Sequence, residues 1–258
     1  MISAAVPYFG EAGGPFDATM ARGAAGAALP MCEQIGPKLW KLMDVASDAE
    51  CASLIDAAER IGFEGAASYC HLYRTRYNDR LVANDEALAA ALGKRCLSLL
   101  PRTVSSPAWG DGDGVWRVDA LNPRFRLCKY VDGHYFGPHI DGNYNASRTR
   151  RSRLTFMMYL NPAAATPSAA MQPGSGGAAT PSALPTCSGG STNFFKRTGR
   201  RDSKLDTSEV AHEIVPSPGL AVAFFQCDSD GDLLHEGARV TGGTKYILRT
   251  DIMCELEE

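Results

Sequence analysis

The feature that most constrains the fold is a change in the character of the sequence at Arg124. From there onward, short runs rich in β-branched and aromatic residues alternate with Gly, Pro, Asn and Asp, a pattern typical of strands joined by turns. We expect strands at 125–130, 154–160, 193–195, 220–225 and 245–253. A helical first third followed by this strand-rich remainder predicts an α+β fold that is mainly β, with N-terminal helices packed on one sheet of a double-sheet structure such as a jelly roll.

Two helices are predicted before this region. Ser47 and Glu50 have the spacing of a capping box, and the apolar residues that follow, up to Ile61, fall on one helical face. A second helix is expected to begin at Asn84 or Asp85, because acidic residues there would lie at its positive end and Leu88, Leu92, Cys96 and Leu99 follow at helical spacing.

The chain has 258 residues, of which 45% are hydrophobic, enough for one sizeable core. Residues 1–36 are rich in small residues without an apolar period, and we expect a flexible tail, followed by one catalytic domain over 37–258. Residues 162–188 are almost entirely Pro, Ala, Gly, Ser and Thr and carry no charge, which predicts an inserted loop between two strands and a candidate flap over the site.

Composition excludes several classes of protein. The formal net charge is -3 and there is no long basic run, so a dedicated nucleic-acid binder is not expected. The eight cysteines lack C-x-x-C spacing and are expected to be reduced thiols. Neither a signal peptide nor a membrane span is evident, which favours a cytoplasmic or nuclear protein without a membrane partner.

Three residues have the chemistry of a metal site. His139 and Asp141 are two positions apart, so in a strand both side chains would point the same way, and His235 follows the predicted strand at 220–225. Two imidazoles and one carboxylate on one face of an iron leave positions open for a co-substrate and O2. An isolated H-x-D pair is by default structural, but here a strand and a glycine turn precede it directly.

Two cations follow on the next predicted strand. Lys245 and Arg249 share one strand face with Ile247 and Asp251. A lysine that points into a β structure is costly unless it meets an anion, such as the far carboxylate of an iron-bound dicarboxylate. Arg249 would be a second anion contact or would pair with Asp251.

A polar stretch between the predicted helices is the candidate substrate side of the site. Arg74, Arg76, Asn78 and Arg80 form this stretch. A solvated loop is the plainer interpretation. The sharper hypothesis places Asn78 and Arg80 at the pocket, in contact with the substrate.

Several segments occur in an order and spacing that is specific when taken together. They are 49–56 with Gly62 and Phe63, the Y-x-x-G-x-x-F-x-x-H-x-D run from Tyr130 to Asp141, 154–161, 189–194, and His235 with Lys245. From about Leu39 to Cys254, apart from the insertion, the chain resembles the Fe(II)/2-oxoglutarate-dependent dioxygenases, specifically their prolyl 4-hydroxylase-like branch. It departs at Phe136, where collagen-type prolyl hydroxylases carry a tyrosine.

The resemblance implies a double-stranded β-helix that binds iron through His139, Asp141 and His235 as the catalytic residues. It also implies that Lys245 holds the far carboxylate of 2-oxoglutarate. The other expected co-substrate contacts are Tyr130, Tyr159, Thr192 and Arg249.

We therefore expect a dioxygenase that hydroxylates an aliphatic C–H, with a peptide side chain as the first substrate choice, as in prolyl hydroxylases, and that releases succinate and CO2. Its expected cofactors and co-substrates are Fe(II), 2-oxoglutarate and O2, with ascorbate. Two alternatives stay open at this point: the same chemistry on a small metabolite, and a non-catalytic, metal-holding binding module.

Overall fold

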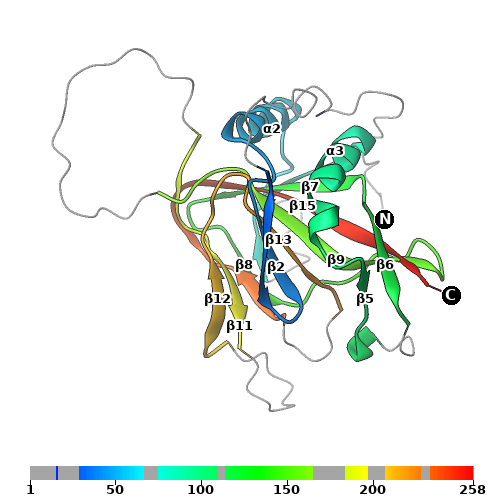
Figure 1. The fold of residues 1–258 in the computed structure, drawn as a ribbon. Coiled ribbons are helices and arrows are strands. Elements are labelled where there is room, and N and C mark those ends of the chain that lie inside the picture. The colour runs from blue at the N-terminus through cyan, green and yellow to red at the C-terminus, as the bar shows by residue number, and fades with distance from the viewer. Residues whose placement is uncertain are drawn as a thin grey trace, which may run out of the picture.

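Two antiparallel sheets make up most of the computed structural model (Figure 1), which describes residues 16, 29–66, 75–109, 114–164, 184–196, 207–227 and 233–257. The strands of the larger sheet are β1 (Met31–Gly36), β2 (Leu39–Met43), β4 (Asp79–Asn84), β5 (Thr103–Val104), β6 (Trp116–Leu121), β7 (Arg124–Val131), β9 (Arg150–Tyr159), β10 (Cys187–Gly189), β13 (Ala221–Phe225) and β15 (Val240–Leu256). Its main path runs β1-β2-β13-β9-β15-β6-β5, and β7 and β10 also pair with β15.

The smaller sheet has the order β12-β11-β14-β8-β3. Its strands are β3 (Arg76–Tyr77), β8 (Tyr135–His139), β11 (Thr192–Phe195), β12 (Val210–Ile214) and β14 (His235–Gly237). All five strands predicted from the sequence are confirmed, as β7, β9, β11, β13 and β15. The mainly β, jelly-roll-like architecture is confirmed with them.

Both predicted helices are present, as α2 (Asp48–Ile61) and α3 (Glu86–Cys96), and short 3-10 turns lie at Leu97–Leu99 and Pro107–Trp109. Ser47 caps α2 in a full capping box with Glu50, and the Asp85 carboxylate accepts from Leu88 N–H at 2.8 Å at the start of α3. The Glu50 carboxylate also pairs with Arg95 of α3 at 2.7 Å. The two helices lie together on one side of the strands (Figure 1).

The helices have defined contacts with the larger sheet. Glu59 of α2 accepts from the Tyr246 hydroxyl of β15 at 2.6 Å and pairs with Lys129 of β7 at 2.9 Å. Helix α3 lies against β6. That the two helices together cover one face of this sheet stays a prediction.

The first third is less helical than expected, because strands occur before and between the helices. Residues 31–36, assigned to the tail from sequence, form β1, which pairs with β2, and β2 in turn pairs with β13 through Leu39 and Leu42. Phe16 is fully buried, and its backbone N–H donates to Asp85 Oδ2 at 2.9 Å. Backbone pairing with β2 orders residues 31–36, which stay partly exposed, whereas burial of its ring holds Phe16.

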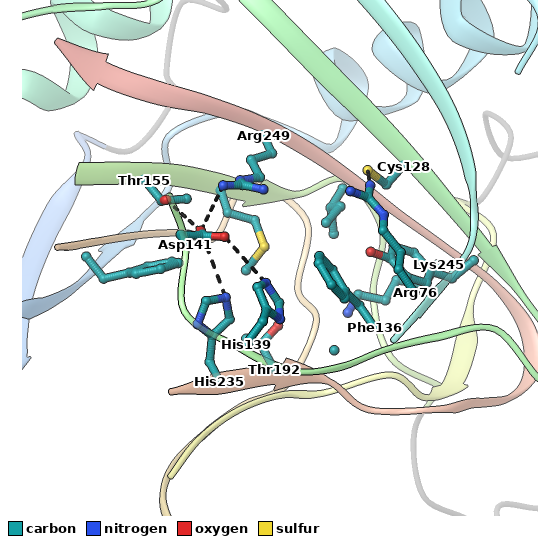
Figure 2. Close-up of a pocket in the computed structure, with 15 residues that line it drawn as sticks. Arg76, Cys128, Phe136, His139, Asp141, Thr155, Thr192, His235, Lys245 and Arg249 are labelled. Atoms are coloured by element: carbon teal, nitrogen blue, oxygen red, sulfur yellow. Dashed lines mark hydrogen bonds and ion pairs between the residues drawn. The ribbon is translucent and has the colours of Figure 1, made fainter. Parts of the chain in front are cut away.

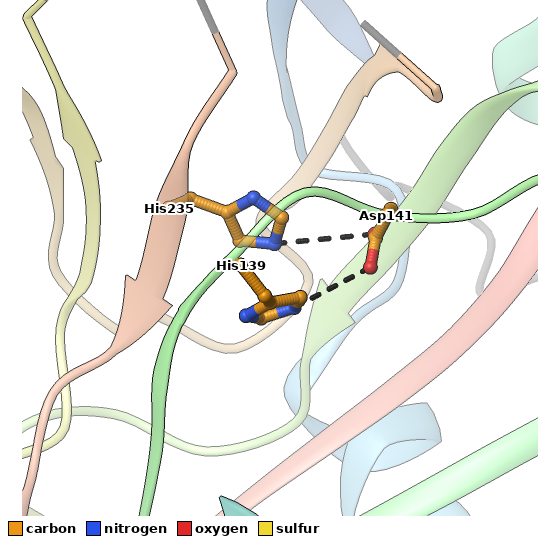
Figure 3. Close-up of side chains that lie close together, drawn as sticks. All are labelled: His139, Asp141 and His235. Carbon is orange, nitrogen blue, oxygen red and sulfur yellow. Dashed lines mark ion pairs between the residues drawn. The ribbon is translucent and has the colours of Figure 1, made fainter. Parts of the chain in front are cut away.

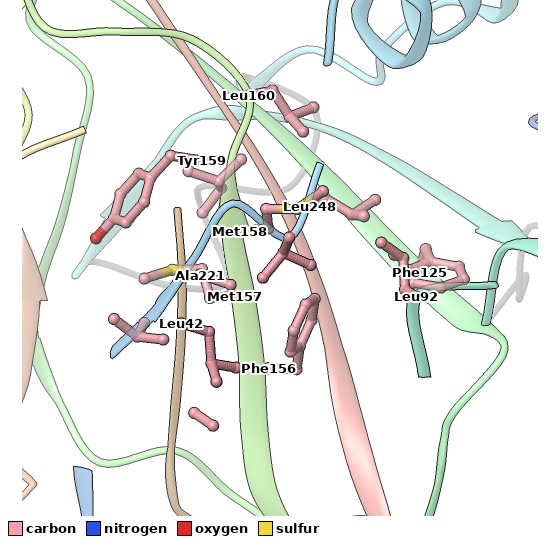
Figure 4. Close-up of a cluster of buried hydrophobic side chains, with 14 of the residues drawn as sticks. Leu42, Leu92, Phe125, Phe156, Met157, Met158, Tyr159, Leu160, Ala221 and Leu248 are labelled. Carbon is pink, nitrogen blue, oxygen red and sulfur yellow. The ribbon is translucent and has the colours of Figure 1, made fainter. Parts of the chain in front are cut away.

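The core is built around the central strands β9 and β13. Every residue of β13 is buried, and β9 is buried from Ser152 to its end, so both strands are covered on both faces. Phe156 and Met158 belong to the cluster of buried side chains drawn with Leu248 in Figure 4. The alternate residues Thr155 and Met157 line the site described below.

The predicted insertion at 162–188 follows β9, but its last two residues, Cys187 and Ser188, belong to β10, so only its earlier part lies between the two strands. The ends of that part are paired. Ala163 forms a bridge with Cys187, and Ala164 N–H donates to Cys187 C=O at 2.7 Å. Residues 165–183 and the flap predicted there lie outside the described part of the chain. No helix within the described residues is long and apolar enough to cross a membrane.

Candidate metal centre

The two histidines are brought together by strand pairing. β14 pairs with β8, and His235 lies directly opposite His139. Asp141 comes two residues after His139, just beyond the end of β8 and not within the strand as expected, yet its carboxylate still turns toward both rings (Figure 3). His139 Nε2 lies 3.4 Å from Asp141 Oδ1, and His235 Nε2 lies 3.9 Å from Asp141 Oδ2. One ligand atom from each of the three residues falls within 4.8 Å of the others.

Backbone carbonyls fix which nitrogen of each ring points at the centre. His139 Nδ1 is 2.8 Å from Gly137 C=O, and His235 Nδ1 is 2.9 Å from Leu233 C=O. A carbonyl only accepts, so each Nδ1 carries a proton and Nε2 is the nitrogen of each ring that can bind a metal. Nε2 of His139 faces a carboxylate oxygen of Asp141, an arrangement that a shared metal cation would stabilise.

Burial and charge set the protonation states. Asp141 and His235 are each 5% exposed. Burial lowers the pKa of His235 to about 4, so its ring is neutral at neutral pH. Burial would raise the pKa of Asp141, but the Arg249 guanidinium holds that pKa well below its usual range. A neutral imidazole and an ionised carboxylate are the forms that bind metals, so the residues fit a two-histidine, one-carboxylate iron site.

Aromatic rings surround the two imidazoles. Phe136 stacks on the His139 ring with a centroid separation of 3.6 Å and an interplanar angle of 12°. The rings of Phe194 and Phe224 lie 5.3 Å and 4.8 Å from His235. The phenylalanine that departs from the collagen-type pattern thus serves as an apolar wall for the first histidine.

Lys245 is buried in the same pocket, on the side away from Arg249 (Figure 2). Within the described residues, no carboxylate lies within ion-pair distance of its ammonium, which donates to Gly190 C=O. Burial lowers the pKa of Lys245 to about 8. A Cβ on Gly190 would come within 3.1 Å of the lysine Cδ, so the glycine allows this close approach.

The other predicted co-substrate residues gather around Lys245. The lysine Nζ lies 5.3 Å from the ring centroid of Tyr130 and 5.4 Å from that of Tyr159. The Tyr159 hydroxyl donates to Thr192 Oγ1 at 2.7 Å, which leaves the Thr192 hydroxyl proton for another acceptor. Tyr130 and Thr192 line the pocket, and Tyr159 supports Thr192 from behind.

Of the two roles predicted for Arg249, the pairing with Asp251 is wrong, and the second contact to the co-substrate anion stays a prediction. Arg249 Nη2 lies 2.9 Å from Asp141 Oδ2, so its observed partner is a candidate metal ligand. Asp251, the carboxylate expected to pair with it, instead pairs with Arg126 at 3.3 Å. The predicted alternation of side chains along β15 was correct. Asp141, however, follows β8 of the smaller sheet, and the pattern of one strand does not show which residues of another sheet will contact it.

Arg76, which was named in the polar stretch but not predicted to lie at the pocket, lines it, whereas the predicted substrate residues Asn78 and Arg80 do not. Asn78 is fully buried, and its Oδ1 accepts from Arg76 Nε at 2.6 Å. The backbone of Arg80 pairs with Glu64. The Arg76 guanidinium lies 4.8 Å above the Phe136 ring and donates to Cys128 Sγ at 3.3 Å (Figure 2). The pairing of β3 with β8 brings Arg76 there, and sequence offers no signal for that pairing.

The pocket lies between the two sheets. Lys245, Arg249, Thr155 and Tyr130 come from the larger sheet, and His139, His235 and Thr192 come from the smaller one. The cavity is narrow, about 30 Å³. A jelly-roll-like fold in which two histidines and one carboxylate converge between the sheets defines a class of protein, the mononuclear non-haem iron oxygenases.

Comparison with known proteins shows which group of iron oxygenases the chain resembles. Residues 125–250, which include every candidate metal and co-substrate residue, match the model of the 2OG-Fe(II) oxygenase superfamily. Over this segment the chain is similar to the superfamily, and it is a dioxygenase whose cofactors are Fe(II) and 2-oxoglutarate. No curated protein matches the sequence.

Similar solved structures are prolyl hydroxylases. A viral collagen prolyl hydroxylase from Paramecium Bursaria Chlorella virus-1, in a 2OG complex, is 21% identical, with 85% of this chain and 97% of that chain covered and a TM-score of 0.50. A Pseudomonas putida prolyl-4-hydroxylase is 14% identical, with 83% of this chain and 92% of that chain covered and a TM-score of 0.48. A Trichoplax adhaerens prolyl hydroxylase in complex with a hypoxia inducible factor peptide fragment is 16% identical, with 83% of each chain covered and a TM-score of 0.49. The viral enzyme supports the shared fold.

Proposed function

We propose that this dioxygenase hydroxylates an aliphatic C–H of a peptide side chain, with proline as the preferred residue, while 2-oxoglutarate and O2 are converted to succinate and CO2. The observation that carries the proposal is that His139, Asp141 and His235 converge in one buried pocket with Lys245. The bound iron and 2-oxoglutarate supply the oxidising chemistry, and the protein supplies orientation and a dry site.

In this proposal the iron is held by the Nε2 atoms of His139 and His235 and by the Asp141 carboxylate. The Nδ1–H bonds to Gly137 and Leu233 keep both rings in the binding tautomer. Because Phe136, Phe194 and Phe224 cover the imidazoles, few orientations are open to the rings and water is kept from their faces.

Lys245 is the anchor for the far carboxylate of 2-oxoglutarate. Its ammonium is buried among Tyr130, Tyr159 and Thr192, and an anion there would offset the cost of burying it. The Thr192 hydroxyl, whose oxygen accepts from Tyr159, donates its own proton to the same carboxylate. Arg249 keeps its contact with Asp141 and is not the main anchor.

The substrate is proposed to contact the wall formed by Arg76 and Phe136. The Arg76 guanidinium is held by Asn78 and Cys128 and faces the same cavity as the candidate ligands. Guanidinium N–H groups suit peptide carbonyl oxygens, which supports a peptide over a small apolar metabolite. The fold similarity to a collagen prolyl hydroxylase supports proline as the first residue to test.

The testing experiment is succinate formation from 2-oxoglutarate by the purified chain with Fe(II), ascorbate and O2, with and without a panel of proline-containing peptides. We expect succinate to rise with one peptide and to disappear in the His235→Ala variant. Turnover that rises only with small metabolites would replace the peptide by the metabolite alternative. Absence of succinate under all conditions, with metal still bound, would favour the non-catalytic binding module.

A further inference from the structure

The Asp141 carboxylate is held mainly through one of its two oxygens. Oδ2 accepts from the Thr155 hydroxyl at 2.7 Å and lies 2.9 Å from Arg249 Nη2. The other oxygen, Oδ1, faces His139 Nε2. Figure 2 shows Thr155 and Arg249 on the same side of Asp141, opposite the two imidazoles.

Thr155 is in turn held by Gln226, a residue that follows β13 and does not line the cavity. Gln226 is fully buried, and its Nε2 lies 3.1 Å from Thr155 Oγ1 and 2.8 Å from Asp251 Oδ1. Its Oε1 accepts from the Ser152 hydroxyl at 2.7 Å. Thr155 and Asp251 are cross-strand partners on β9 and β15, so one amide group bridges both strands.

The direction of every hydrogen bond in this series is determined by its ends. Tyr144 N–H can only donate, and it donates to Ser152 Oγ at 2.7 Å, so the Ser152 proton goes to Gln226 Oε1. Asp251, which is paired with Arg126, can only accept, so the Gln226 NH₂ group faces it and Thr155. The oxygen of Thr155 therefore accepts, and its single proton points at Asp141 Oδ2.

We propose that Gln226 is a positioning residue for the metal centre: acting through Thr155, it directs a proton at Asp141 Oδ2 and so leaves Oδ1 as the oxygen offered to the metal. This inference rests on the proposed role of Asp141 as a ligand. A threonine hydroxyl without Gln226 would rotate toward other acceptors, and the carboxylate would lose its fixed orientation. Partners of metal ligands of this kind are worth about 10- to 100-fold in metal affinity.

The test is a double-mutant cycle with Co(II) affinity as the measurement, which needs neither 2-oxoglutarate nor a substrate. Thr155→Val and Gln226→Met keep side-chain size and remove the hydrogen bonds. We expect each to raise the Co(II) Kd about tenfold and to change the Co(II) ligand-field spectrum in the same way. Because Gln226 acts through Thr155, the double variant should bind no more weakly than the weaker-binding single variant.

The matched control is Asn161→Leu, which removes another fully buried amide. Asn161 bonds to the backbone of Pro185, Thr244 and Tyr246 and has no contact with the candidate ligands. This variant should lower the melting temperature but keep the wild-type Co(II) Kd and spectrum. A wild-type Kd in Gln226→Met, or multiplied effects in the double variant, would overturn the proposal.

Two further measurements cover the cases in which Gln226→Met does not fold or the metal site is misassigned. If Gln226→Met does not fold, Ser152→Ala removes the donor that orients the Gln226 amide, and a wild-type Co(II) Kd in that variant would equally refute the proposal. If His235→Ala binds Co(II) as tightly as the wild type, the metal site itself is misassigned. That result identifies failure of the proposed function and not of the Gln226 role.

Discussion

At the residue scale, two cations on one strand face have different partners. Lys245 lies among Tyr130, Tyr159 and Thr192, whereas Arg249 lies on Asp141. The difference arises because Arg249, unlike Lys245, is within reach of the Asp141 carboxylate, which follows β8 of the smaller sheet. The two side chains should therefore affect the kinetics differently.

Replacement of the two cations should separate their roles. Lys245→Ala should raise the KM for 2-oxoglutarate at least about 30-fold, which corresponds to roughly 2 kcal/mol for loss of a buried charged contact. Arg249→Gln keeps a donor for Asp141 and should change that KM less than about threefold. Initial rates of succinate formation over a range of 2-oxoglutarate concentrations measure both. A larger effect of Arg249→Gln would reverse the assignment of the anchor.

The pKa of Lys245 predicts how co-substrate binding depends on pH. Burial lowers this pKa to about 8, so in the free enzyme the ammonium is present below pH 8 and is lost as pH rises through it. Because only the ammonium attracts the carboxylate, the KM for 2-oxoglutarate should be level below pH 8 and rise about tenfold per pH unit above it.

Lys245→Arg is the control for this pH profile. A guanidinium stays protonated throughout the range, so the rise above pH 8 should disappear even if the variant binds 2-oxoglutarate less tightly. The same alkaline rise in Lys245→Arg would mean that another group causes it.

At the scale of elements, local patterns were reliable because they depend on neighbours along the chain. The capping box at Ser47 and the acidic cap at Asp85 predicted the starts of α2 and α3, and both bonds are present. What the pattern did not contain is the second use of Glu50, which also pairs with Arg95 and so joins the two helices. That contact depends on how α3 packs beside α2.

Substitutions in the cap should therefore differ in cost. Ser47→Ala should lower the free energy of unfolding by about 1 kcal/mol, the usual value for a lost cap. Glu50→Ala should cost more, about 2 kcal/mol or above, because it also removes the carboxylate that pairs with Arg95. Urea unfolding measures both. Ser53→Ala, on the exposed part of α2, is the control and should change stability by less than about 0.5 kcal/mol, and equal costs at Ser47 and Glu50 would contradict the double role of Glu50.

At the scale of the whole molecule, the sheet holds the two ends of the insertion next to each other. Ala163 and Cys187 are bridged, so the ends of the segment are held together by the sheet. A long loop between fixed ends contributes little to stability, because the entropy of closing it changes slowly with length.

Replacement of residues 165–183 by a Gly-Ser linker of about five residues should leave the fold and the metal site intact. We expect a melting temperature within a few degrees of the wild type and an unchanged Co(II) Kd. If the segment acts as a flap, the KM for the peptide substrate should rise while uncoupled 2-oxoglutarate turnover persists. Loss of Co(II) binding in this variant would show that the insertion supports the centre itself.

Residue types at short, regular spacing were enough to predict β7, β9, β11, β13 and β15, the helix caps, the three candidate ligands and Lys245. Three features emerged only from the packing of the chain: Arg76 lines the pocket while Asn78 and Arg80 do not, Arg249 contacts Asp141, and Gln226 reaches Asp141 through Thr155. Periodicity specifies which face of a strand a side chain occupies. It does not specify which strand lies across from that face, since that is set by sheet pairing between segments far apart in the chain.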